Sequence, residues 1–321
     1  DAVELLPNHK KYFEALSRTR LLCEQNEPIS EKELAEAVFA VLNSSASGSA
    51  LIVVNRRATV NRLYEMLEER LSHVFALSTY LTPRDRKVRI SEIRERLAKG
   101  ESCVVVSTQL IEAGVDLSFP IVFRDLAPLD CIIQTAGRCN RHGEEEVGAV
   151  HLVCLDGQQG HQWHKIYDAP LVEATVDVLG EKEIYCEYEF LELAQRYFSA
   201  CKNRQQQNRV DELLPQGKFN ELPKEFQLIP EGLPTRSFFV IRDTEDADLW
   251  AKYIDLEAQL PIDRERIFRT FKANFYERVV QVYGTSEEGI CPLPFGPGTY
   301  DPDLGYVGLP TEEQEDRVII L

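Results

Sequence analysis

Between Leu51 and Leu155, short apolar runs alternate with segments that have helical periodicity. Each run is only a few residues long and apolar throughout, which is typical of a strand buried on both faces of a sheet. Parallel strands need a crossover between them, so this alternation predicts an α/β fold whose parallel sheet carries functional residues at the carboxyl ends of its strands. The predicted strands are 51–54, 74–77, 103–106, 121–123 and 150–155, and the predicted helices are 58–71, 83–98 and 130–139.

The chain has 321 residues, which is long for a single domain. Residues before about 20 are weakly helical, and a capping box at Ser30-Glu31-Lys32-Glu33 begins a helix. Helical periodicity returns at 165–200 and 246–283, whereas residues 284–310 contain no predicted element. We therefore predict three parts: a connector with a leading helix (1–47), the α/β domain (48–156), and a linker followed by an acidic, smaller, mixed and largely helical accessory domain (157–321).

Charge is distributed unevenly along the chain, whose formal net charge is −17. Residues 51–143 carry 14 basic and 11 acidic residues, whereas residues 144–321 carry 17 basic and 34 acidic residues. Phosphate binding needs a local excess of Lys and Arg, so any nucleic-acid contacts belong to the α/β domain. For the acidic domain we consider two explanations, a face that repels DNA and docks a partner, or simply a solvated surface.

Nothing in the sequence indicates a membrane span or a secretory signal, because no apolar run reaches the roughly 18 to 20 residues that a span requires. We expect a cytoplasmic protein without membrane contact. The eight cysteines form no Cys-x-x-Cys pair, so we interpret them as reduced and structural. The only methionine, Met66, lies inside a predicted helix, and we therefore expect the chain to be a fragment of a longer polypeptide.

Two polar motifs occur between Cys103 and Gly143. The first follows the third predicted strand and reads Thr108-Gln109-x-x-Glu112-x-Gly114-x-Asp116; the second reads Gln134-x-x-Gly137-Arg138-x-x-Arg141. Arginine offers a rigid fork of donors for the charge that develops during phosphoryl transfer, and two arginines three residues apart share one face of a helix. Alone, the second motif would be an ordinary surface helix with solvated arginines. Its pairing with a strand-end motif favours a nucleotide site, where Gly137 would allow close approach of a backbone or phosphate.

These residues resemble motifs IV, V and VI of the second RecA-like lobe of superfamily 2 helicases. Motif IV corresponds to 51–67, motif V to 107–116 and motif VI to 134–141. More narrowly, 106–116 together with 127–141 resembles the CRISPR-associated helicase-nuclease that degrades DNA in type I interference. The similarity is specific across about 50–155, and Tyr300-Asp301-Pro302-Asp303-x-Gly305-Tyr306 is a weaker match to the tail of that family.

The resemblance implies a role for each site residue. It implies that Arg138 and Arg141 are arginine fingers and that Gln134 contacts the γ-phosphate or its attacking water. Gly114, Asp116 and Gly137 would belong to the nucleotide cleft. Asn55, Arg56, Thr108 and Gln109 would hold the backbone of single-stranded DNA. A structural alternative is that the two arginines pair with Asp116 or Asp125.

The resemblance also implies ATP and Mg²⁺, both held mainly by a first RecA-like lobe that this sequence lacks. It contains no Gly-x-x-x-x-Gly-Lys-Ser/Thr loop, and the only Asp-Glu pair, Asp211-Glu212, follows a glutamine-rich segment rather than a strand. The family's nuclease domain needs a His-Asp metal cluster, and no His-Asp dipeptide occurs. His161, His164 and Cys154 lack the spacing of a complete zinc ligand set, so we predict no metal site.

Three functional interpretations remain open. The first is the second motor lobe of a single-stranded DNA translocase, whose partners would be the first lobe, the nuclease domain and a CRISPR RNA-guided surveillance complex. The second is another superfamily 2 helicase that acts on DNA or RNA. The third is a non-enzymatic regulatory or protein-binding module that keeps the fold of a motor lobe. In every case we expect the chain alone not to hydrolyse ATP.

Overall fold

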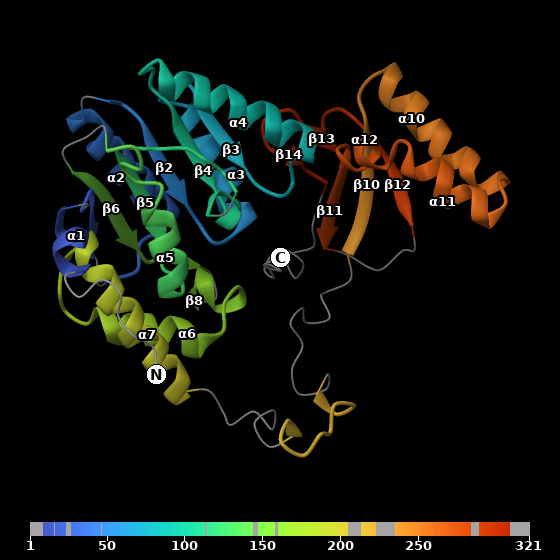
Figure 1. Cartoon of the computed structure of the whole chain (residues 1–321). Helices are drawn as coiled ribbons and strands as arrows, with labels where there is room; N and C mark the ends of the chain where they lie inside the picture. Colours follow the sequence, from blue (N-terminus) through green and yellow to red (C-terminus); the bar gives the residue numbers. More distant parts are fainter. Residues whose placement is uncertain are drawn as a thin grey trace. The chain divides into compact units, whose positions relative to one another are not determined.

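A computed structural model describes most of the chain (Figure 1). The described residues are 9–15, 17–23, 27–45, 47–112, 114–143, 147–157, 160–204, 213–222, 235–283 and 289–308. Ala113 of the strand-end motif, Gln205–Gln207, Asp211-Glu212 and parts of 284–310 lie outside these ranges. The chain divides into two compact units: unit 1 comprises Asp1–Ser30, Ser118–Leu233 and Arg317–Leu321, and unit 2 comprises Glu31–Leu117 and Pro234–Asp316.

Within the largest sheet, the strands of unit 2 follow the order β3-β4-β2 and the strands of unit 1 follow the order β5-β6-β1-β9. Strand β4 is parallel to β2 and β3, β6 is parallel to β5 and β1, and β9 is antiparallel to β1. Every predicted strand is present, with ends shifted by one or two residues, so the expected α/β fold is confirmed. Strands β2, β3 and β4 belong to unit 2, and β1, β5, β6 and β9 belong to unit 1. Their bounds are Thr19–Leu22 (β1), Ala50–Val53 (β2), Val74–Leu77 (β3), Val104–Ser107 (β4), Ile121–Asp125 (β5), Gly148–Val153 (β6) and Ile184–Cys186 (β9).

Strands β1 and β9 were not expected from the sequence. The predicted connector supplies β1, which pairs in parallel with β6, and the region predicted as helical around 165–200 supplies β9, which pairs antiparallel with β1. Leu21 of β1 is fully buried and the neighbouring Arg20 is exposed. Strands of three and four residues are too short to produce a period-2 signal, and β1, unlike the predicted strands of the same length, is not an apolar run, because Arg20 interrupts it.

The helices of unit 2 that precede the first motif follow the sequence pattern closely. Leu34, Val38 and Leu42 are buried along α2. Thr82 caps α4, because its side chain accepts a hydrogen bond from the Asp85 amide and a proline follows at the first helical position. These helices are α2 (Glu31–Ser44), α3 (Arg57–Glu68) and α4 (Pro83–Ala98), and a short 3₁₀ turn, η1 (Gln109–Ile111), follows β4.

Unit 1 packs three of its helices against one another, with α6 in contact with both α5 and α7. Helix α6 buries Val172, Thr175 and Leu179 on one side. The helices are α1 (His9–Ala15), α5 (Leu129–Ala136), α6 (Ala169–Leu179) and α7 (Phe190–Arg204), with 3₁₀ turns η2 (Gln162–Lys165) and η3 (Glu187–Glu189) and a small hairpin of β7 (Asp156–Gly157) and β8 (Gly160–His161).

Residues 235–306, which we call the C-terminal module, are built on a three-stranded sheet in the order β11-β10-β12. Strand β11 (Val279–Tyr283) ends a stretch predicted as helical, and β12 (Ile290–Pro294), β13 (Tyr300–Asp301) and β14 (Gly305–Tyr306) occupy a stretch without a predicted element, so both expectations were wrong there. The remaining elements are β10 (Thr235–Ile241), α10 (Thr244–Asp255), η4 (Leu256–Ala258), α11 (Pro261–Arg269) and α12 (Lys272–Tyr276).

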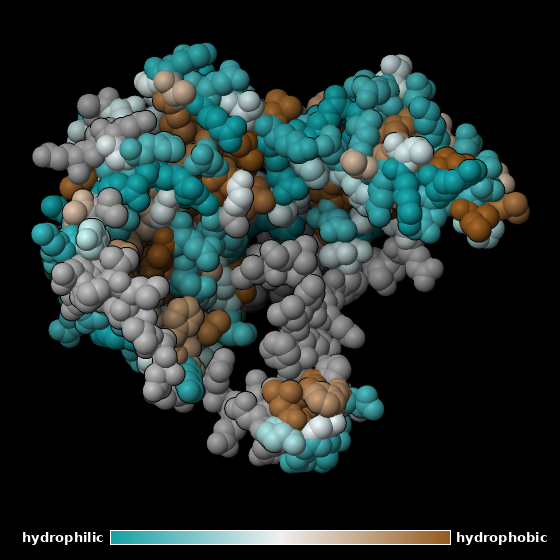
Figure 2. Space-filling view, viewed as in Figure 1, coloured by the Kyte–Doolittle hydropathy of each residue, from teal (hydrophilic) through white to brown (hydrophobic). Residues whose placement is uncertain are grey.

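Aromatic rings join one face of this small sheet to its helices. The fully buried ring of Phe275 lies 4.6 Å from that of Phe239 and 4.4 Å from that of Tyr253, between ring centroids. At the end of the module where α10 leads to α11, apolar side chains reach the surface (Figure 2), and Leu260 and Ile262 are exposed. None of the described helices is long and apolar enough to cross a membrane.

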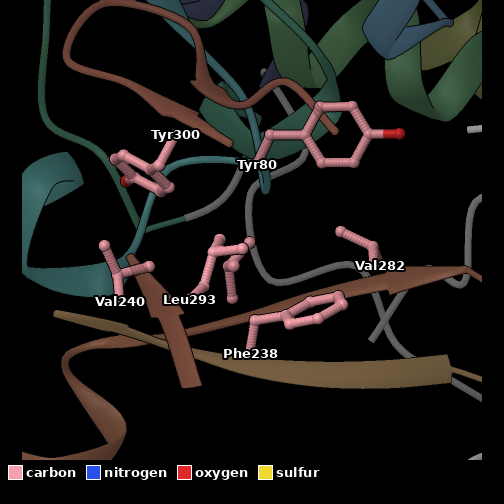
Figure 3. Close-up of a cluster of buried hydrophobic side chains, with 7 residues drawn as sticks. Tyr80, Phe238, Val240, Val282, Leu293 and Tyr300 are labelled. Atoms are coloured by element: carbon pink, nitrogen blue, oxygen red, sulfur yellow. The ribbon is translucent and has the colours of Figure 1, made fainter. Parts of the chain in front are cut away.

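The other face of the small sheet is covered by Tyr80, which comes from the loop between β3 and α4. Figure 3 shows Tyr80 and Tyr300 lying over Phe238, Val240 and Leu293 of the sheet. Tyr300 is fully buried and Tyr80 is 5% exposed. The C-terminal module and the loop before α4 therefore share a single apolar core within unit 2.

A polar network surrounds this core at the start of α4. The Asp85 carboxylate accepts hydrogen bonds from the Arg242 guanidinium, the Tyr300 hydroxyl and, at 2.7 Å, the Thr82 hydroxyl. The Tyr300 hydroxyl in turn accepts a hydrogen bond of 2.8 Å from the Thr82 amide. Tyr300 opens the weak tail match, residues 300–306, so this tail motif fastens the module to α4.

The rest of the tail motif binds a little further along the same helix. The Arg89 guanidinium donates to the Pro302 carbonyl (2.6 Å) and to the Asp303 carboxylate (3.1 Å), and also to the Ala76 carbonyl of β3 (2.9 Å). The Tyr306 amide donates to the Tyr80 carbonyl at 2.9 Å. Helix α4 and the loop before it therefore meet the module through contacts at both ends of the tail motif.

Gly305 offers a direct test of this packing. A Cβ atom at Gly305 would overlap the Tyr80 carbonyl oxygen, and the φ of +85° at Gly305 favours glycine. We expect Gly305→Ala to lower the free energy of unfolding of unit 2 by about 1–3 kcal/mol, as overpacking does, measured by urea denaturation with Trp250 fluorescence. Gly298→Ala is the matched control, because Gly298 has a φ of +79° with no atom within 4 Å of the added Cβ. Equal losses in the two variants would show that backbone conformation, not close approach, sets the cost.

Candidate nucleotide and nucleic-acid site

The residues predicted to bind nucleic acid follow the carboxyl ends of neighbouring parallel strands in unit 2. Val53 and Leu77 both stand opposite Ser107, so β2, β3 and β4 end at the same level of the sheet. Asn55 follows β2 by two residues, and Thr108 follows β4 directly. The expected placement of Thr108 at a carboxyl end is therefore confirmed, and these residues gather at one edge as functional residues do in such sheets.

Hydrogen bonds join two of these segments. The Gln109 side-chain amide donates to the Asn55 carbonyl at 3.3 Å, and the Val54 amide donates to the Ser107 carbonyl at 2.9 Å. The Thr108 amide donates to the Leu77 carbonyl at 3.2 Å, which ties the same segment to the end of β3. The structure thus brings Asn55, Thr108 and Gln109 together around the ends of three strands.

These residues differ in their access to solvent. Asn55 is fully buried and Thr108 is 4% exposed, whereas Gln109 and Arg56 are half-buried. Arg56 has extended backbone (φ −112°, ψ 139°) at the N-cap of α3. Of the four predicted contacts, Arg56 and Gln109 are the side chains with the readiest access to a strand of DNA.

Arg57 is a residue that sequence reasoning missed. Its guanidinium lies 4.3 Å from the centre of the Tyr80 ring, a cation–π contact, and donates to the Thr79 hydroxyl at 3.4 Å. Tyr80 is part of the core shared with the C-terminal module. The only sequence signal was the Arg56-Arg57 pair itself, which does not reveal which of the two arginines packs against that core.

Arg86 is a second residue that the motifs did not identify. It lies in the first turn of α4, is half-buried, and has no hydrogen-bond or ion-pair partner for its guanidinium within the described parts of the chain. Burial lowers the pKa of Arg86, and the nearby Tyr300 opposes that shift. Each of the neighbouring residues Arg84 and Asp85 makes an ion pair with the C-terminal module, which sets Arg86 apart.

Gly114 and Asp116 lie on the exposed side of the strand-end motif, also in unit 2. Gly114 has a φ of +74°, and an added Cβ would meet no atom within 4 Å. Its requirement for glycine is therefore conformational and not steric. Asp116 is exposed between Val115 and Leu117, which are both buried, so the segment holds its acidic side chain toward solvent.

The arginine motif lies in unit 1, and the prediction that its arginines share a helix face was wrong. Helix α5 ends at Ala136, Gly137 is its C-cap with φ −63°, and Asn140 has a φ of +45°. The turn at Asn140 takes the chain out of helical geometry between the two arginines. Accordingly Arg138 is 7% exposed, whereas Arg141 is exposed.

Short backbone pairings replace the missing last turn of helix. The Phe119 amide donates to the Arg138 carbonyl at 2.9 Å, and the Asn140 amide donates to the Phe119 carbonyl at 2.8 Å. Cys139 lies between them with 2% of its surface exposed, and its thiol contacts the Pro120 and Ala149 carbonyls at 3.5 Å. Arg138 is thus anchored in the unit, and Arg141 projects from the turn that follows.

Gln134 and Gly137 are exposed near the carboxyl end of α5. A Cβ on Gly137 would lie 3.2 Å from the Gln134 carbonyl oxygen, which is tighter than an ordinary van der Waals contact. Gly137 is nevertheless exposed, so a ligand can approach its backbone from solvent.

The side chains of Cys154, His161 and His164, which the sequence analysis considered as metal ligands, lie near one another. The Cys154 thiol lies 3.5 Å from His161 Nδ1, and the His161 and His164 rings stack with centroids 5.6 Å apart. Trp163 lies against His164 at 3.8 Å between centroids. Within the described residues, no three His, Cys, Asp or Glu side chains form a group that could hold a metal ion.

The cysteines give a prediction about reactivity. Burial raises the pKa of the Cys103 and Cys139 thiols to about 12, so both stay protonated at pH 8 and react poorly with iodoacetamide. We expect neither to be alkylated in the folded protein and both to be alkylated in urea, as read by peptide mass spectrometry. Cys186, which is half-buried, is the internal comparison. Rapid labelling of Cys139 in the folded protein would show that the arginine turn opens readily.

Comparisons of the sequence with known proteins identify a related family. The profile of a family described as "CRISPR-associated nuclease/helicase Cas3, C-terminal" matches residues 46–144. The CRISPR-associated nuclease/helicase Cas3 of Haloferax volcanii is 54% identical over 72 residues, which are 22% of this chain and 8% of that protein.

Solved structures extend the likeness in fold. The crystal structure of T. fusca Cas3-AMPPNP matches 92% of this chain and 41% of that chain, with a TM-score of 0.57 and 16% identity. A chain of the "CRISPR RNA-guided surveillance complex, pre-nicking" matches 90% of this chain and 44% of that chain, with a TM-score of 0.56 and 14% identity. The chain thus spans less than half of these solved relatives. Through the sequence matches across residues 46–144, this part of the chain is similar to the C-terminal helicase region of the CRISPR-associated nuclease/helicase Cas3 family.

Proposed function

We propose that this chain is the second motor lobe, with an accessory module, of an ATP-dependent single-stranded DNA translocase that acts in type I CRISPR interference. The observation that carries the proposal is the family match across residues 46–144, which contains both polar motifs in the expected order. The parallel strand ends that carry Asn55 and Thr108 support it, since ligands of α/β sheets bind at such ends.

In this proposal, the chain supplies the arginine side of an ATP site. Arg141 is exposed and lies beyond the end of α5, so it can reach a γ-phosphoryl group held by another lobe, and Arg138 provides a second, anchored positive charge. In our proposal, the nucleotide cleft also includes Gln134, Gly137, Gly114 and Asp116. The likeness in fold to the AMPPNP form of T. fusca Cas3 supports a nucleotide ligand.

The residues of this chain fit part of the ATP site only. The sequence has no phosphate loop, so its groups would neutralise charge and not cradle the phosphates. Mg²⁺ and most of the ATP contacts belong, in our proposal, to the first RecA-like lobe. ATP supplies the γ-phosphoryl group whose transfer to water drives opening and closing of two lobes.

For DNA, we propose that Arg56 and Gln109 bind the phosphate backbone. Thr108 and Asn55, which are buried behind them, hold the segments that follow β4 and β2 in place. Arg86 is a further candidate for a phosphate contact, because its half-buried charge has no acidic partner within the described residues. The likeness in fold to a chain of the pre-nicking complex supports a CRISPR RNA-guided surveillance complex as a partner, and the acidic accessory domain is a candidate docking surface.

The experiment that tests this function combines the chain with a matching first lobe and measures ATP hydrolysis with and without single-stranded DNA. We expect no hydrolysis by the chain alone and DNA-stimulated hydrolysis by the pair. Competition with RNA of the same sequence separates the DNA translocase from an RNA helicase. A pair that binds but never hydrolyses ATP would instead favour a non-enzymatic regulatory module.

A further inference from the structure

The turn that carries Arg141 is held by a residue far away in the sequence. The Arg18 guanidinium donates to the Arg141 carbonyl at 2.5 Å, and the Arg18 carbonyl accepts a hydrogen bond from the Asn140 side-chain amide at 3.1 Å. The Arg18 carbonyl also accepts from the Gly148 amide at 2.8 Å. Arg18 therefore contacts both Arg141 and the positive-φ residue before it, Asn140.

Glu187 fixes Arg18 in this position. Its carboxylate accepts a hydrogen bond of 2.6 Å from the Arg18 amide and lies 3.6 Å from the Arg18 guanidinium. The same carboxylate is 3.5 Å from the Thr19 hydroxyl. Strand β1 begins at Thr19 and η3 begins at Glu187, so two elements of unit 1 meet at Arg18, and the sequence pattern missed the first of them.

This contact matters because the turn around Arg141 is not helical. Asn140 (φ +45°) and Gly143 (φ +67°) bend the backbone on either side of Arg141, and the Gly143 amide donates to the Asn140 carbonyl at 3.0 Å across the turn. Misplacing a catalytic group by about 1 Å can reduce a rate by roughly a hundredfold. A bond to the Arg141 carbonyl is therefore well placed to set where its guanidinium acts.

We propose that Arg18 and Glu187 are positioning residues for Arg141 in ATP hydrolysis. The inference rests on the proposed function, in which Arg141 acts on the γ-phosphoryl group. Arg18 does not touch the nucleotide in this proposal; it acts only through the turn. The leading segment, expected from the sequence to be a mere connector, would then be part of the catalytic apparatus.

Stability and catalysis should respond differently to loss of Arg18. Its side chain is 44% exposed and that of Glu187 is 29% exposed, and such surface ion pairs contribute little to folding. Arg18→Ala should leave the unfolding transition of unit 1, followed by Trp163 fluorescence, nearly unchanged. A role confined to folding would not lower kcat under those conditions.

The test uses variants of the chain combined with a matching first lobe. We expect Arg18→Ala to lower kcat for ATP roughly ten- to a hundredfold with KM for ATP changed much less. Glu187→Gln should lower it less, and combining both substitutions should add little to Arg18→Ala, because they act through one contact. Arg18→Lys keeps a positive donor and should recover most of the activity. Arg20→Ala, an exposed arginine two residues along β1, is the matched control and should behave as the unaltered protein.

Hydrogen exchange on the chain alone adds a readout independent of ATP. Peptides that cover 139–143 should exchange faster in Arg18→Ala than in Arg20→Ala, because the Arg141 carbonyl and the turn lose a hydrogen bond. Absence of hydrolysis by the unaltered protein with its first lobe would overturn the proposed function. An unchanged kcat in Arg18→Ala, when Arg141→Ala is inactive, would overturn the positioning inference alone, and so would an unchanged exchange rate.

Discussion

Arg141→Ala should reduce DNA-stimulated ATP hydrolysis by about 10³ to 10⁵, the contribution measured for arginine fingers in other nucleotide hydrolases. This corresponds to roughly 4 to 7 kcal/mol of activation free energy. The loss should appear in kcat measured with the chain and a matching first lobe. Arg141 is the better test of the two arginines because it is exposed, so its removal should not disturb packing, whereas Arg138 is almost completely buried.

The matched control for Arg141 is Arg266→Ala. The Arg266 side chain is 79% exposed and pairs with Asp263 on the surface of α11, so its removal should affect neither folding nor hydrolysis. Arg141→Lys is informative as well, because lysine keeps the charge and loses the fork of donors. Full activity in Arg141→Ala would refute the assignment of Arg141 as a catalytic residue.

Asp246→Ala should lower the free energy of unfolding of unit 2 by about 3–5 kcal/mol, as expected when one partner of a buried ion pair is removed. The Asp246 carboxylate is fully buried and accepts hydrogen bonds from the Arg278 guanidinium and, at 3.2 Å, from Arg84 and the Arg242 amide. Arg278 is only 4% exposed. Without Asp246, the Arg278 guanidinium would keep only the exposed Glu245 carboxylate and the Asn274 oxygens as partners among these contacts.

Tryptophan fluorescence can follow the unfolding of unit 2 separately from that of unit 1. The sequence has two tryptophans, Trp163 in unit 1 and Trp250 in unit 2, so Trp163→Phe leaves a single reporter inside the aromatic core of the module. Asp248→Ala is the matched control, because Asp248 is an exposed aspartate two residues further along α10. A urea midpoint for Asp246→Ala equal to that of Asp248→Ala would show that the buried charges find other partners.

The α/β domain could be predicted well because its strands are uniform apolar runs separated by amphipathic helices. Val104–Ser107 is buried along its whole length and Val74–Leu77 nearly so, and such runs stand out in a sequence. Strand β1 is different, because Leu21 is its only fully buried residue and its place depends on pairing with β6, which begins at Gly148. Local pattern cannot report a pairing of that kind.

The candidate site, too, could be predicted only in part from the sequence. Residue types and their order predicted Thr108 at a strand end, but they could not show that α5 stops at Ala136 and separates the environments of Arg138 and Arg141. That ending depends on Phe119, whose backbone pairs with the segment after the helix. The role of Arg18 also depends on a long-range contact, with the Arg141 carbonyl. Residue types thus indicated the chemistry of the motifs, and tertiary contacts decide which side chains are presented.

The fastening of the tail motif to α4 has a consequence for how the protein is made. The Thr82 amide and the Tyr300 hydroxyl are separated by 218 residues, so the start of α4 waits for its partner until nearly the whole described chain has left the ribosome. At about 5–20 residues per second that wait lasts roughly 10 to 40 s. During this interval Tyr80 lacks the strands that cover it, and the segment before α4 exposes apolar surface. We therefore expect the core around Tyr80 to close only after residues 300–306 have been synthesised.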